Sequence, residues 1–110
     1  MKNRIEIAQE FADNIKDKSI KKIVLYGSVA RGDDTEDSDI DILIVSNHQN
    51  EIEEKITDEI FNIIVKYREL ISAHVITEEH YINTKNYSFL TNINKEGILI
   101  GWTRNKWLSN

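Results

Sequence analysis

The feature that most constrains the fold of this chain is a pair of apolar runs separated by an acidic loop. The first run, IKKIVLY, covers residues 20–26, and the second, DIDILIV, covers residues 39–45. Both are short and rich in branched residues, so each is predicted to form a strand. The second run is apolar at nearly every position after Asp41, which is typical of a central strand. A sheet is therefore expected around these two segments.

Helical patterns surround the two strands. Apolar residues spaced by three and four predict an amphipathic helix over residues 3–18. GSVARG, residues 27–32, suits a short helical turn between two glycines. A longer helix follows, and its predicted apolar face consists of Ile52, Ile56, Ile60, Ile63, Ile64 and Tyr67.

In the last third of the chain, strands and helices are predicted to alternate. ELISAHVIT, residues 69–77, contains a third strand, and Thr77 can cap a helix over residues 78–83. A further helix is expected over residues 88–95, and ILIGW, residues 98–102, is expected to be a closing strand. This order predicts an α+β fold, with a mixed sheet and helices packed on one side.

Size and composition narrow the class of protein. At 110 residues, with 40% apolar and 30% charged residues, the chain fits one globular domain over residues 1–110. No apolar run reaches the ~20 residues that a bilayer requires, and no secretory signal is recognisable, so a cytoplasmic protein is expected. The absence of cysteine excludes disulfides and thiolate metal sites.

The net charge of the chain narrows the classes of ligand that it is expected to bind. A net charge of -5 argues against nucleic acid, because binding to a phosphate backbone depends on clustered Lys and Arg. Small phosphorylated ligands stay open, because a bound divalent cation can reverse the local sign of an acidic site.

Two aspartates at the start of the second strand are the candidate metal ligands. Residues two apart face the same way in a strand, so the Cβ atoms of Asp39 and Asp41 are expected roughly 6.5 to 7 Å apart on one face. Ile40, Ile42 and Ile44 then point into the core. Two carboxylates this close repel unless a cation lies between them. Mg²⁺ suits such a pair and leaves coordination places for substrate phosphates.

The turn before the acidic loop is a candidate phosphate site. Gly27 allows close approach of the backbone to a ligand, and Ser28 opens a turn whose free N–H groups point outward. Arg31 adds a planar fork of donors suited to phosphate oxygens. The other acids of the loop, at positions 33, 34, 36 and 37, are expected to be solvated.

The stretch GSVARGDDTEDSDIDILIV resembles the signature of the minimal nucleotidyltransferases of the DNA polymerase beta superfamily. That signature is Gly-Ser, ten residues, then Asp-x-Asp, which Gly27-Ser28 and Asp39-Ile40-Asp41 reproduce. Arg31-Gly32 and Ser38 also fit it. The resemblance implies a nucleotidyltransferase fold in which Gly27, Ser28, Arg31 and Ser38 contact the nucleotide.

The resemblance also implies an activity. Members transfer a nucleoside monophosphate, here expected to be AMP, from Mg²⁺-bound ATP or another NTP to an acceptor hydroxyl. Many resemble antitoxins encoded beside a helical HEPN protein, which some of them adenylylate on a tyrosine. A HEPN-domain partner is therefore expected, and assembly into a homo-oligomer is a further possibility.

The third strand departs from the family pattern. A catalytic member is expected to carry a third carboxylate there, whereas Ser72 or His74 occupies the corresponding position. Deprotonation of the acceptor then falls to His74, the candidate catalytic base, or to water, although a histidine flanked by apolar residues is often structural. Two alternatives remain: a weakened member that neutralises its partner by contact alone, and a sugar-nucleotide transferase that uses Asp-x-Asp with Mn²⁺.

Overall fold

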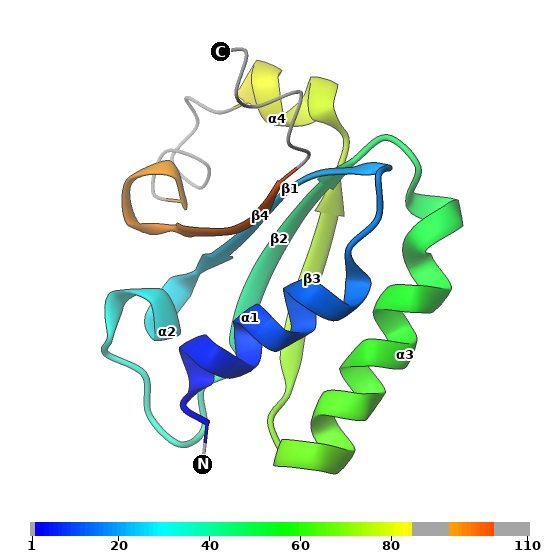
Figure 1. The fold of residues 1–110 in the computed structure, drawn as a ribbon. Helices are drawn as coiled ribbons and strands as arrows, with labels where there is room; N and C mark the ends of the chain where they lie inside the picture. Colours follow the sequence, from blue (N-terminus) through cyan, green and yellow to red (C-terminus); the bar gives the residue numbers. More distant parts are fainter. Residues whose placement is uncertain (1, 85–92, 103–110) are drawn as a thin grey trace.

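The computed structural model describes residues 2–84 and 93–102, and the elements follow the predicted order (Figure 1). In chain order they are α1 (Arg4–Ile15), β1 (Ile20–Tyr26), α2 (Gly27–Arg31), β2 (Ile40–Ser46), α3 (Gln49–Tyr67), β3 (Ile71–Ile76), α4 (Glu78–Thr84) and β4 (Ile98–Trp102). Residues 93–96 are also helical, and the rest of the helix predicted over residues 88–95 lies outside the described residues.

The strands form one four-stranded mixed sheet, as predicted. Its order is β3-β2-β1-β4, so β1 and β2 are the central strands. β1 pairs antiparallel with β2 and with β4, whereas β2 pairs parallel with β3. The parallel pair requires a crossover connection, and α3 provides it. β2 is therefore enclosed between two neighbours, and its isoleucines 40, 42 and 44 are fully buried.

The two long helices lie together on one face of the sheet (Figure 1). α1 begins at a capping box in which Asn3 and Glu6 exchange hydrogen bonds, and it ends at Ile15 rather than at the predicted residue 18. Its buried stripe is Ile7, Ala8, Phe11, Ala12 and Ile15. The main core lies between these two helices and the inward-facing residues of β1 and β2.

The opposite face has a smaller cluster of buried residues. Its members are Val24, Leu43, Val45, Tyr81 and Ile93. α4 therefore adds partial cover on the side away from α1 and α3. Thr77 caps α4 as predicted, because its hydroxyl accepts a hydrogen bond of 3.0 Å from the His80 amide.

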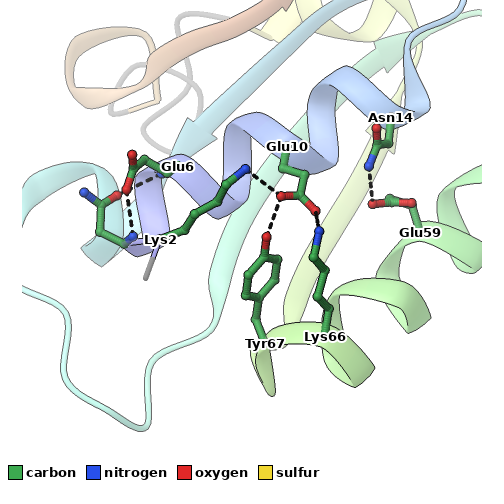
Figure 2. Close-up of polar contacts among 8 residues, drawn as sticks. Lys2, Glu6, Glu10, Asn14, Glu59, Lys66 and Tyr67 are labelled. Atoms are coloured by element: carbon green, nitrogen blue, oxygen red, sulfur yellow. Dashed lines mark hydrogen bonds and ion pairs between the residues drawn. The ribbon is translucent and has the colours of Figure 1, made fainter.

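A polar network joins α1 to α3 at the edge of the main core (Figure 2). The Glu10 carboxylate accepts hydrogen bonds from Lys2 Nζ at 2.8 Å, Lys66 Nζ at 3.0 Å and the Tyr67 hydroxyl at 2.6 Å. The bond from Lys2, followed by those from Tyr67 and Lys66, lowers the pKa of Glu10 to about 2. Glu10 therefore holds the C-terminal end of α3 against α1.

α3 differs from its predicted apolar face at one residue. Ile52, Ile56 and Ile63 are buried, and Ile60 and Tyr67 pack against the core, but Ile64 is 38% exposed. Ile64 lies at the margin of the contact with the sheet, where periodicity alone does not determine burial. No helix in the described part of the chain has the length and apolar composition needed to cross a membrane.

Candidate active site

Asp39 and Asp41 lie at the start of β2, on the side away from α1 and α3. Asp39 directly precedes the strand and is exposed, whereas Asp41 lies within the strand and is partly buried. Asp41 is the register partner of Tyr26 on β1 and of Ser72 on β3. The carboxylate of Asp41 is thus held by the sheet, while Asp39 belongs to the end of the loop.

Gly27 brings the start of α2 against the Asp41 carboxylate. It has φ +75°, and a Cβ atom built on it would overlap an Asp41 carboxylate oxygen. A residue with a side chain would require the Asp41 carboxylate to move, so glycine suits this approach. The close neighbour that the structure gives Gly27 is thus the Asp41 carboxylate, and its approach to a ligand stays a prediction. Ser28 is the next residue along the chain, so the turn that it opens lies beside Asp41.

The electrostatics of Asp41 link it to several predicted site residues. Burial raises the pKa of the Asp41 carboxyl, and the neighbouring Asp39 charge raises it further. Arg31 and His74 act in the opposite direction and favour the ionised form. Burial, followed by the charge of Asp41, also raises the pKa of Tyr26 to about 12. A divalent cation beside Asp39 and Asp41 would relieve their repulsion.

Arg31 lies at the end of α2 and is engaged with acidic side chains. Its guanidinium contacts Asp33 at 3.2 Å and Glu96 at 3.5 Å, and its side chain is 42% exposed. These exposed ion pairs are weak, so a phosphate group can replace them at little cost. Gly32, at φ +83°, then ends the helix. The structure therefore places Arg31 near Asp41 with its donors shared between two carboxylates.

Ser38 shapes the loop that leads into Asp39. Its hydroxyl accepts a hydrogen bond of 2.9 Å from the Thr35 amide, and its own amide donates to the Thr35 carbonyl at 3.0 Å. The hydroxyl groups of Thr35 and Ser38 also lie 3.4 Å apart, within hydrogen-bond distance. They close a turn immediately before the aspartate.

Arg4 anchors the same loop from α1, and sequence analysis did not identify it. It donates to the carboxylates of Asp34 and Glu69, each at 3.0 Å, and to the carbonyls of Thr35 at 2.6 Å and Glu36 at 3.1 Å. These partners lie 30 or more residues away in sequence, so no local pattern indicates them. Arg4 thereby ties α1, the acidic loop and the start of β3 together.

β3 supplies Ser72 and His74 to the face that carries Asp41. Ser72 is the register partner of Asp41, and His74 is the partner of Leu43 one step further along. His74 is exposed and within electrostatic reach of Asp41. β3 contains no acid. Within residues 2–84 and 93–102, no group of three or more His, Asp or Glu residues could by itself hold a metal ion.

The donor set present nevertheless fits one hard cation. Mg²⁺ in phosphate-processing sites is commonly held by one or two carboxylates, and its other positions are taken by water and substrate phosphates. Asp39 and Asp41 provide that number, and burial, followed by the charge of Asp39, raises the pKa of Asp41. The residues that would hold the ion are therefore these two aspartates.

A mixed sheet that sets the Asp41 carboxylate against a glycine-serine turn, with Asp39 just before the strand, is the arrangement expected of the nucleotidyltransferase class. The chain belongs to the nucleotidyltransferase domain family, whose model matches residues 5–97. This is a family of enzymes, and the match confirms the family and the nucleotidyltransferase assignment that the Gly-Ser and Asp-x-Asp spacing indicated.

Two relatives come from Methanocaldococcus jannaschii, and both are provisionally named protein adenylyltransferases. One is 41% identical over 98 residues, covering 86% of this chain and 95% of that protein. The other is 35% identical over 102 residues, with the same coverage of 86% and 95%.

Solved structures share the fold. A nucleotidyltransferase structure from Sulfolobus solfataricus has a TM-score of 0.55 at 23% identity and covers 94% of this chain and 83% of that one. A toxin–antitoxin structure with AMP-PNP has a TM-score of 0.56 at 18% identity, with coverage of 94% and 77%. These likenesses support the predicted nucleotidyltransferase fold.

Proposed function

We propose that this chain transfers AMP from Mg²⁺-bound ATP to a hydroxyl group on a partner protein of the HEPN type. The observation that carries the proposal is the contact between the Gly27 turn and the Asp41 carboxylate, beside Asp39. Two relatives named protein adenylyltransferases support the choice of AMP and of a protein acceptor. A requirement for ATP also favours the cytoplasm as the site of action.

Each site residue has a proposed role. Asp39 and Asp41 would hold Mg²⁺, which would offset negative charge on the transferred phosphate and on pyrophosphate. The backbone at Gly27 and Ser28 receives the phosphates, and Arg31 exchanges its acidic partners for a phosphate oxygen. Ser38, a predicted nucleotide-contacting residue, acts through the turn it closes before Asp39.

The proposed reaction is one in-line displacement. The acceptor hydroxyl oxygen forms a bond to the α-phosphorus as the bond to the bridging oxygen of the β-phosphate breaks. Pyrophosphate leaves, and AMP remains joined to the partner through a phosphodiester. The proton of the hydroxyl passes to His74, which lies exposed on the same face as Asp41.

Transfer of label from ATP tests this proposal. ATP labelled at the α-phosphate is incubated with the chain and a HEPN-type partner, and label on the partner is measured. Asp39→Asn is expected to lower the rate by at least about a hundredfold, because a metal ligand is lost. Asp37→Asn removes an exposed acid of the same loop and serves as the matched control. Equal rates in Asp39→Asn and the wild type would contradict the proposed site.

A contact-only function is the second candidate. The observation that favours it is β3, which carries Ser72 and His74 where a carboxylate is expected. In that case the wild-type chain binds and neutralises its partner, no label is transferred, and Asp39→Asn neutralises equally well. His74→Ala refines the test, because loss of a general base lowers transfer by about a hundredfold or more without affecting binding of the partner.

A further inference from the structure

α3 carries an exposed apolar stripe on the side facing away from the core. Phe61 is 64% exposed, Val65 is 65% exposed and Ile64 is 38% exposed. Positions three and four apart share one face of a helix, so these side chains adjoin one another. Leu70, which is 48% exposed, lies with Ile64 and Val65 around a shallow hollow just beyond the helix. We name Phe61, Ile64, Val65 and Leu70 the α3 stripe.

Charged residues flank the stripe symmetrically. Glu54 lies seven residues before Phe61, and Arg68 lies seven residues after it. Seven residues are about two turns, so Glu54 lies on the same side of α3 as Phe61, about 10 Å from it. Arg68 caps the C-terminal end of α3 in a left-handed conformation and borders the hollow with Ile64 and Val65. Glu54 and Arg68 are both exposed. Within residues 2–84 and 93–102, neither side chain forms an ion pair.

This arrangement is complementary to itself in one orientation. When a second α3 lies antiparallel across the first with the two Phe61 side chains at the centre, Glu54 of each copy faces Arg68 of the other. A parallel arrangement would instead set Glu54 against Glu54 and Arg68 against Arg68. A two-fold axis requires each surface to match itself, and the antiparallel pairing satisfies that condition.

We propose that the α3 stripe binds a second copy of this chain through an antiparallel α3–α3 contact. The apolar side chains meet at the two-fold axis, and a Glu54–Arg68 ion pair closes each end. The contact area comes from one 19-residue helix and Leu70, which is less than a standard protein interface uses. The dimer is therefore weak and depends on concentration. The proposal is independent of the nucleotide site on the other face of the sheet.

Sedimentation velocity of the full chain tests the dimer. Between low micromolar and near-millimolar concentration, the wild type is expected to shift from monomer to dimer. Phe61→Glu places two like charges at the axis and is expected to weaken dimerisation by at least about thirtyfold. Ile82→Glu, at a 54% exposed position on α4, introduces the same charge elsewhere and should leave the dimer unchanged.

Charge exchange tests the orientation. Glu54→Lys and Arg68→Glu are each expected to dimerise poorly alone, because each creates two like-charge contacts. An equimolar mixture of these variants re-forms both ion pairs, so dimers should return. Thermal melting of each variant verifies that it is folded. A wild type that stays monomeric overturns the proposal and leaves the stripe to a different protein. A mixture that stays monomeric, or equal loss in Ile82→Glu, also overturns it.

Discussion

At the scale of single residues, Gly27 and Gly32 share a backbone conformation but differ in the neighbours that a side chain would meet. Gly27 and Gly32 have similar left-handed conformations, with φ of +75° and +83°. A side chain at Gly27 would meet Asp41, whereas a Cβ atom at Gly32 has no neighbour within 4 Å. The cost of the conformation for an L-residue, roughly 1–2 kcal/mol, is therefore common to both positions. The contact with the aspartate belongs to Gly27 alone.

Alanine substitution is predicted to distinguish the two glycines. Gly32→Ala should lower the free energy of unfolding by about 1 kcal/mol through strain alone. Gly27→Ala should cost at least about 1 kcal/mol more, because Asp41 must move, and it should also abolish label transfer. Urea denaturation and the transfer assay measure both effects. Equal losses of stability and activity in the two variants would show that Asp41 is not held against this turn.

At the scale of elements, polar side chains hold α1 in place against its neighbours. Arg4, at one end of α1, binds the acidic loop. Glu10, in the middle of α1, binds the end of α3 (Figure 2). Each makes several bonds to groups brought together only by folding. α1 therefore positions the loop that ends at Asp39 as well as covering the sheet.

The Glu10 network is predicted to have a characteristic dependence on pH. The pKa of Glu10 is lowered from 4.5 to about 2, so its stabilising effect is complete above pH 4.5 and is lost as the pH falls through 2. Glu10→Gln should therefore be less stable than the wild type by about 1 kcal/mol at pH 7 and equally stable near pH 2. Urea denaturation at several pH values measures the difference.

A surface glutamate provides the control for this experiment. Glu53→Gln changes an exposed residue of α3 and should alter stability by no more than about 0.5 kcal/mol. A Glu10→Gln penalty that is the same at pH 2 and pH 7 would show that lost packing, rather than the carboxylate, causes it.

At the scale of the whole molecule, the site joins α2, β1, β2 and β3 on the side of the sheet away from the main core. Ligand binding to Asp39 and Asp41 should therefore stabilise the fold as a unit. A ligand at 100 times its Kd adds about 2.7 kcal/mol to the free energy of unfolding. That amount is a large part of the stability of a small domain.

Thermal unfolding is predicted to report binding of Mg²⁺ and ATP. The Tm of the wild type should rise by several degrees when both are present at saturation, and chelation of Mg²⁺ should reverse the rise. Asp39→Asn should show little increase, whereas Asp37→Asn should behave as the wild type. An unchanged increase in Asp39→Asn would place the nucleotide elsewhere. This measurement detects binding even if the chain acts by contact alone.

Local sequence patterns predicted most of the elements and the residues of the candidate site. The spacing of apolar residues predicted β1 at its observed bounds, and the glycine-serine and Asp-x-Asp spacing indicated both the family and the paired carboxylates. These features depend on neighbours within a few positions, which the sequence displays directly. The roles of the predicted site residues stay predictions, and these residues are Gly27, Ser28, Arg31, Ser38, Asp39, Asp41 and His74.

Only the tertiary structure decided which distant groups meet. The anchoring of the loop by Arg4, the exposure of Ile64 and the contact of Gly27 with Asp41 each depend on how separate elements pack. The sheet order likewise depends on pairing between strands that are far apart in the chain. Such contacts arise from the balance of burial and hydrogen bonding over the whole molecule, and no short stretch of sequence carries that information.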